Sequence, residues 1–128
     1  MAEKILRRLF SGGIIDNMPK RPADAQLIFA LAASSLTSQV KYSEIEINEH
    51  LKEWLNVFAS TEVLDHVTIR RCLIDHGLVL REPSGATYEA NQAVISSYID
   101  AGARTIHPGD ILEAVQREKK LRKRAYGI

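Results

Sequence analysis

Closely spaced lysines and arginines near the C-terminus are the side chains whose type and spacing point most directly to a chemistry. Six of the eight residues in 117–124 (REKKLRKR) are basic and one is acidic. Ammonium and guanidinium groups at this density bind phosphates, because they replace the counterions around a nucleic-acid backbone. The plain alternative is a solvated helix end. The basic residues that we expect to contact nucleic acid here are Arg117, Lys119, Lys120, Arg122, Lys123 and Arg124.

A second group of arginines lies in the middle of the chain, in the segment 68–88 (TIRRCLIDHGLVLREPSGATY). Arg70 and Arg71 fall on a predicted helix, and Arg81 ends a predicted strand. The planar fork of arginine fits both guanine edges and phosphates, so these three are further expected nucleic-acid contacts. Arg71 also precedes Asp75 by four residues, a spacing that suits a surface ion pair on one helix.

Other residue types give weaker indications of chemistry. Cys72 and His76 are four residues apart on one predicted helix, but two ligands are too few for a zinc site. Glu49 and Glu53 could form an acid–base pair, although a solvated acidic face is the plainer interpretation. Central aromatic residues could line a ligand pocket or, more simply, pack in the core: Tyr42, Trp54 and Tyr88. We therefore expect no enzyme activity, no metal and no cofactor.

The net charge of +1 hides an uneven distribution. The run 117–124 carries +5, and the other 120 residues carry −4 because they hold 11 basic and 15 acidic residues. The segment 43–66 holds six acidic residues and one basic residue, Lys52. Phosphates would repel such a segment, which moves the expected nucleic-acid contact from the centre of the chain to its basic end. The same asymmetry favours an alternative, in which the basic run docks on the acidic segment of its own chain or of a second copy.

Length and composition predict one globular domain. A chain of 128 residues suits a single core, and 45% hydrophobic with 26% charged residues is ordinary for such a domain. The longest apolar run, residues 27–33, is too short to span a bilayer, and the N-terminus MAEKILRRLF has no hydrophobic signal core. The single cysteine excludes an intrachain disulfide. We expect a cytoplasmic protein without membrane contact.

Apolar spacing and helix-end signals predict the elements that position these residues. A first helix over residues 5–10 stops at Gly12 and Gly13, and a second runs from about Asp24 to about residue 37. Ser43 and Glu46 form an S-x-x-E capping box for a third helix that continues to residue 55. A fourth covers 66–76, with Asp65 as its N-cap and Gly77 as its end.

The second half is predicted to begin with a β-hairpin. Residues 78–81 form one strand, 83–85 (Pro-Ser-Gly) the turn, and 86–88 the return strand. A helix over residues 93–99 ends near Gly102, and the last helix starts at Pro108. We therefore predict a mainly α protein with a small β-hairpin. It has a winged-helix-like core (10–89), extra N- and C-terminal helices, and a helical extension (90–128) with a basic tail, all within the single domain 1–128.

Several short blocks of the chain also match a known family in order. They are Gly13-Ile14, Met18-Pro19-Lys20-Arg21, Tyr42-Ser43-Glu44, Glu46-Ile47-Asn48 with Leu51, Asp65, Ile69-Arg70-Arg71, Leu73-Ile74-Asp75, Gly77-Leu78, Arg81, Gly85 and Tyr88. On these residues, 10–88 resembles a bacterial domain-of-unknown-function family whose members occur alone or fused to ArsR-type transcriptional repressors. The resemblance implies a winged-helix-like domain associated with transcriptional regulation, and it transfers no catalytic residue. It does not cover the residues after Tyr88.

Two functions follow as expectations. The first is a winged-helix-like regulatory protein that binds DNA through the basic C-terminal helix, helped by the three central arginines. The alternative is a non-enzymatic interaction or assembly module that does not bind nucleic acid. Extra helices outside such a core commonly build dimers, so we also expect a homodimer.

Overall fold

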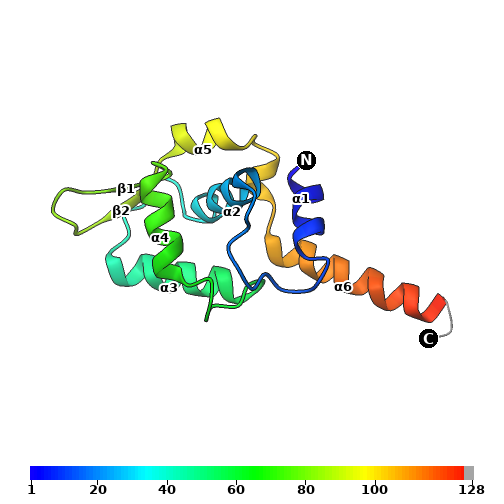
Figure 1. The fold of residues 1–128 in the computed structure, drawn as a ribbon. Coiled ribbons are helices and arrows are strands. Elements are labelled where there is room, and N and C mark those ends of the chain that lie inside the picture. The colour runs from blue at the N-terminus through cyan, green and yellow to red at the C-terminus, as the bar shows by residue number, and fades with distance from the viewer. Residues whose placement is uncertain (126–128) are drawn as a thin grey trace.

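The structure is a computed structural model and describes residues 1–125. It is mainly helical with one small antiparallel hairpin, as predicted (Figure 1). The elements in chain order are α1 (Ala2–Leu9), α2 (Pro22–Ser34), α3 (Glu44–Asn56), α4 (His66–Asp75), β1 (Val79–Arg81), β2 (Tyr88–Ala90), α5 (Gln92–Tyr98), the short 3-10 helix η1 (Ala103–Thr105) and α6 (Pro108–Ala125).

Helix α2 is the central element of the core. Every residue from 27 to 33 is buried, so the longest apolar run of the sequence forms a core helix. Pro22 stands at its first position, where the missing N–H costs no hydrogen bond. The helix ends at Ser34, about three residues earlier than predicted. It contacts α4, α5 and η1.

Helices α3 and α4 lie side by side, and their N-terminal caps are those predicted. The Ser43 hydroxyl accepts a hydrogen bond from the Glu46 N–H at 3.1 Å, and the Glu46 carboxylate accepts one from the Ser43 N–H at 2.9 Å. The Asp65 carboxylate accepts the Thr68 N–H at 2.8 Å. Gly77 follows α4 with a φ of +71°, a conformation that favours glycine.

Strands β1 and β2 form the hairpin, in which Val79 pairs with Ala90 and Arg81 with Tyr88. The return strand starts two residues later than predicted, because the turn occupies residues 82–87: Glu82 accepts from Gly85 and donates to Thr87. Tyr42 forms an isolated antiparallel bridge to the hairpin. Its N–H donates to the Tyr88 carbonyl and its carbonyl accepts the Tyr88 N–H, both at 2.8 Å. The resulting order of helix, bridging strand, two helices and hairpin is consistent with a winged-helix-like fold.

The helices at both ends of the chain join this core. Leu6 and Phe10 of the α1 region and Leu112 and Val115 of α6 belong to the same cluster of buried side chains as α2, α3 and α4. At the start of α6, Gly109 lies against the Val57 side chain at the end of α3. Within residues 1–125, no helix combines the length and the apolar composition that crossing a bilayer requires.

Candidate nucleic-acid interface

Helix α6 leaves the body of the molecule halfway along its length. Its inward stripe begins with the buried residues Pro108, Leu112 and Val115, and the next positions of the same stripe are Lys119 and Arg122. A helical stripe that changes from apolar to charged no longer has a core to cover. All residues from 116 to 125 are accordingly exposed, and Figure 1 shows this end of α6 projecting away from α3 and α4.

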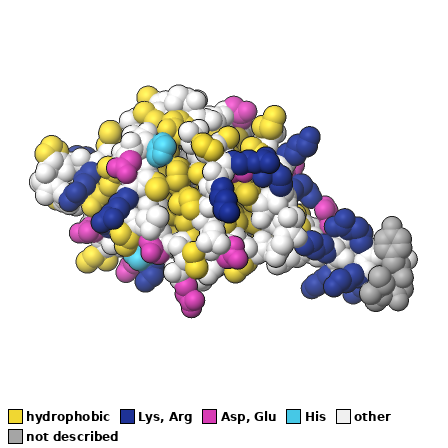
Figure 2. All heavy atoms as spheres, viewed as in Figure 1, with side chains coloured by type: hydrophobic (Ala, Val, Ile, Leu, Met, Phe, Trp, Pro, Cys, Tyr) yellow, Lys and Arg dark blue, Asp and Glu magenta, His cyan; other side chains and the backbone are white. Residues whose placement is uncertain are grey.

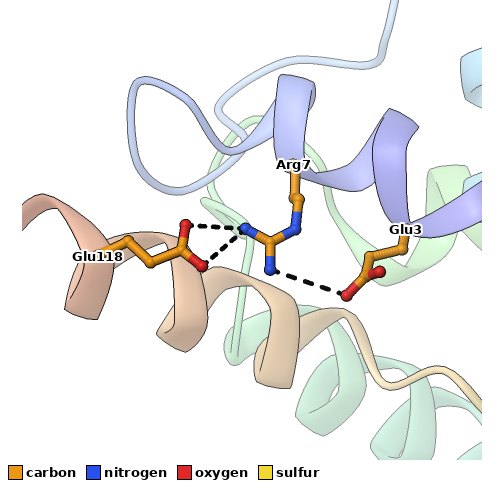
Figure 3. A network of polar contacts seen from close by, with 3 residues as sticks. All are labelled: Glu3, Arg7 and Glu118. Atoms are coloured by element: carbon orange, nitrogen blue, oxygen red, sulfur yellow. Dashed lines mark hydrogen bonds and ion pairs between the residues drawn. The ribbon is translucent and has the colours of Figure 1, made fainter.

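Helix α1 holds the base of the projecting segment. The Arg7 guanidinium lies 2.9 and 3.1 Å from the two carboxylate oxygens of Glu118 and 3.8 Å from Glu3 (Figure 3). The Lys119 ammonium also donates a hydrogen bond to the carbonyl of Ser11, just beyond α1. Glu118 is the acidic residue within the run 117–124, so its pairing with Arg7 neutralises the negative charge in that run.

The six basic residues of the run differ in their contacts. Arg117 is 3.4 Å from Glu113 in an exposed ion pair on the same helix, and Lys119 bonds to Ser11. Among residues 1–125, no carboxylate lies within 4 Å of the other four, which are Lys120, Arg122, Lys123 and Arg124. Four exposed cations within five residues give this segment a strong positive potential.

Arg70 is held within the protein. Its guanidinium donates to the Asn48 side chain at 2.6 Å, lies 3.3 Å from the Glu44 carboxylate, and stands 5.8 Å from the centre of the Tyr88 ring. Only 17% of its side chain is exposed. These contacts tie α4 to α3 and to the hairpin, so Arg70 has a structural role whether or not it meets a ligand.

Arg71 and Arg81 are both exposed, on α4 and at the end of β1. The ion pair between Arg71 and Asp75 that their spacing suggested is not formed, because their charged atoms are more than 4 Å apart. Arg81 lies over the Tyr88 ring at 5.9 Å from its centre. The structure thus places these two arginines at the α4–hairpin side of the molecule, separate from the α6 run (Figure 1).

Most of the residues that gave weaker indications of chemistry in the sequence have structural roles. The His76 ring lies 5.2 Å from the Phe29 ring in a tilted arrangement, and its Nδ1 is 3.1 Å from the Tyr98 hydroxyl. Burial raises the pKa of the Cys72 thiol. Within the described part of the chain, no group of three His, Cys, Asp or Glu residues could hold a metal ion. The central aromatics pack in or against the core: Trp54 and Tyr88 are buried, and the Tyr42 hydroxyl accepts the N–H of Thr37.

Several cations that the sequence did not associate with nucleic acid lie on α1 and just before α2. Arg8 of α1 binds Asp24 at the start of α2 at 2.7 Å, and this pairing raises the pKa of the guanidinium. Lys4 is exposed on the same helix, and Lys20 and Arg21 are exposed just before α2. Figure 2 shows Lys and Arg side chains gathered on this side of the molecule and along the projecting helix. Two sequence signals could have indicated them: the arginine pair of EKILRRL and the KR before Pro22.

The fold and the site together define a small, mainly helical protein whose central helices and hairpin support an exposed cationic helix. By sequence, residues 14–90 match a family described as uncharacterized proteins conserved in bacteria (DUF2087), and the chain belongs to this family. The match runs from the segment after α1 to the end of β2, so it excludes α1, α5, η1 and α6. It confirms that the chain resembles a bacterial family of unknown function. No curated protein and no solved structure matches the chain.

Proposed function

We propose that this protein is a non-enzymatic, cytoplasmic regulatory protein that binds duplex DNA through the basic end of α6. One observation carries the proposal: Lys120, Arg122, Lys123 and Arg124 are exposed, project from the body, and have no acidic partner among residues 1–125. Binding to phosphates gives these charges their missing partners and releases counterions from the DNA. The contact to the backbone carries no sequence information by itself.

The order of elements supports a regulatory role. Helix, bridging strand, two helices and hairpin follow one another as in winged-helix proteins, and the sequence resembles domains found fused to ArsR-type repressors. In this proposal the exposed Arg71 and Arg81 make secondary contacts at α4 and the hairpin, where the major groove and the backbone lie in winged-helix complexes. The acidic α3 next to them weakens this side, which leaves most of the affinity to α6.

Fluorescence anisotropy with a labelled duplex of mixed sequence, at low and at moderate salt, tests the proposal. We expect binding at low salt that weakens steeply as salt rises. The variant Lys120→Gln/Arg122→Gln/Lys123→Gln/Arg124→Gln should lose about 10-fold or more in affinity, because it removes four phosphate contacts. Lys52→Gln, an exposed lysine on α3, serves as the control and should bind as the wild type does. Absence of binding at low salt, or full affinity in the four-residue variant, would contradict the proposal.

A second candidate function is self-association, and the acidic surface of α3 and of the turn after it favours this function. Glu49, Glu53 and Glu62 are exposed, and within residues 1–125 no basic group lies within 4 Å of their carboxylates. Helix α6 starts beside Val57 at the end of α3 and points away, so its basic end does not meet this face of its own chain (Figure 1). A second copy can bring the two charges together in a homodimer.

Sedimentation velocity on two complementary variants tests self-association. One variant carries the four glutamines on α6 and keeps its acidic face, and the other carries Glu49→Lys/Glu53→Lys and keeps its basic helix. Each alone should be monomeric, whereas an equimolar mixture should associate, because only the mixture contains both an intact helix and an intact face. A wild-type protein that stays monomeric at high concentration and low salt rules this function out.

A further inference from the structure

Helix α1 connects two groups of cations that are far apart in the sequence. On one side, Arg8 binds Asp24 at 2.7 Å, and the Asp24 N–H donates to the carbonyl of Arg21 at 3.1 Å. The exposed Lys20 and Arg21 are therefore held beside α1. The Asp24 side chain is only 6% exposed, so this attachment is partly shielded from solvent.

On its other side, α1 holds the basic end of α6. Arg7 binds Glu118, and Lys119 donates to the Ser11 carbonyl. Between the two attachments, Lys4 and Arg8 are exposed and four residues apart, which places them on the same face of α1. Helix α1 thus contacts both the start of α2, which follows Lys20 and Arg21, and the base of the basic end of α6. Figure 2 shows Lys and Arg side chains on this side of the molecule and along the projecting helix.

We propose that Lys4, Lys20 and Arg21 form a second phosphate-binding patch, which contacts the same DNA duplex as the basic end of α6. This inference rests on the proposed DNA binding and adds a separate set of residues to it. All three side chains are exposed, and none has a carboxylate within 4 Å among residues 1–125. Lys20 and Arg21 lie near the start of the residues that match the family, and Lys4 lies before them.

The spacing of the patch and α6 favours a duplex as the ligand. Helix α1 lies between the two cation groups, so they are at least the width of a helix with its side chains apart, about 10 Å. The grooves of B-DNA are about 6 and 12 Å wide between the surfaces of the phosphates that border them, and each strand carries a phosphate about every 3.4 Å along the axis. A duplex can therefore place phosphates of both strands against the two groups at once. The ion pairs Arg7–Glu118 and Arg8–Asp24 hold α1 between them and so keep this spacing.

The salt dependence of binding separates the patch from the basic helix. Each phosphate contact adds about 0.9 to the slope of log affinity against log salt concentration. The variant Lys20→Gln/Arg21→Gln should therefore lower the magnitude of this slope by about 2 and reduce affinity by about 10-fold or more at moderate salt. The control is Lys52→Gln, an exposed lysine on α3 that has no carboxylate within 4 Å among residues 1–125, and the single variant Lys20→Gln is its match in net charge.

Fluorescence anisotropy titrations of these variants against a labelled duplex, over a series of salt concentrations, test the inference. It is supported if the patch variant loses slope and affinity and the control keeps both. It is overturned if the patch variant behaves as the wild type, if the control loses as much, or if a single strand of the same sequence binds more tightly than the duplex. If wild-type binding depends on α6 but not on the patch, this inference alone is overturned. If the wild-type protein does not bind DNA at all, the proposed function itself is contradicted.

Discussion

The Arg7 guanidinium lies 2.9 Å from the carboxylate of Glu118, a residue 111 positions further along the chain. This ion pair joins the first helix to the last one at the point where the last helix leaves the body. It also neutralises the acidic residue within an otherwise basic run. The pair therefore both orients the projecting segment and increases its net positive potential.

The neighbouring arginines of α1 should differ in their importance for stability. Arg8→Ala should lower the free energy of unfolding more than Arg7→Ala, because it leaves the buried Asp24 carboxylate without its partner. Arg7→Ala breaks an exposed pair, which is worth less than about 1 kcal/mol. Urea unfolding of both variants measures the difference. The double variant Arg8→Ala/Asp24→Asn should regain part of the loss, and an equal effect of the two single variants would refute the assignment.

A side chain at position 109, at the start of α6, should destabilise the protein. Gly109→Ala places a methyl group against the Val57 side chain, so we expect it to destabilise the protein by about 1 to 3 kcal/mol. Thermal unfolding followed by circular dichroism measures the change. The double variant Gly109→Ala/Val57→Ala should be more stable than Gly109→Ala alone, because it removes the obstructing methyl groups. A double variant with no such recovery would show that α6 does not pack on the end of α3 in this way.

The capping box of α3 should contribute to stability and to its acid dependence. Ser43→Ala removes one cap hydrogen bond and should cost about 1 kcal/mol. Hydrogen bonds from Ser43 lower the pKa of Glu46 below its ordinary value of 4.5, so the carboxylate stabilises the folded state above that pH and stops doing so as the pH falls through the lowered pKa. Urea unfolding at pH 7 and near pH 3.5 should show a smaller acid loss in Glu46→Gln than in the wild type, because that variant has no carboxylate for the Ser43 backbone N–H to stabilise. An identical loss in both would mean that the box does not hold the carboxylate.

His50 should make stability depend on pH near neutrality. Burial lowers its pKa below the ordinary value of 6.5, against a smaller opposing effect of Glu53, and its Nε2 lies 2.8 Å from the Ser35 hydroxyl. The unfolded chain therefore binds the proton more readily, and stability should decrease as the pH falls below 6.5 toward the lowered pKa. His50→Gln should reduce this dependence between pH 5 and 7.5, as measured by urea unfolding. His107→Gln, an exposed control, should keep it, and a wild-type stability that is flat over this range would contradict the prediction.

Local signals predicted most of the elements and several of their ends. Ser43 with Glu46, Asp65 and Gly77 act within one turn of their own helix, so their sequence positions are sufficient to locate the start of α3 and both ends of α4. The return strand of the hairpin was placed two residues early, at 86–88. The length of a turn depends on which backbone groups pair across it. Here the Glu82 carbonyl accepts the Gly85 N–H and the Glu82 N–H donates to the Thr87 carbonyl, so the turn extends to residue 87.

The sequence predicted only part of the candidate site. The density of cations in 117–124 identified the basic helix end directly. The contacts of Arg70 with Asn48, Glu44 and Tyr88 join residues 18 to 26 positions apart, so its adjacency to Arg71 gave no sign that one is held inside and the other exposed. Neither did the sequence associate Lys4, Lys20 and Arg21 with the basic helix.

By itself, the sequence determined the helical class, the hairpin, the helix caps and the separation of charge between the acidic centre and the basic end, since each of these depends on neighbouring residues or on composition. Only the tertiary structure decided which cations share a surface. Arg7 meets Glu118 and Arg8 meets Asp24 because α1 packs between the first turn of α2 and the side of α6. Such contacts between distant segments follow from burying the apolar faces of three helices in one core, which no local pattern specifies.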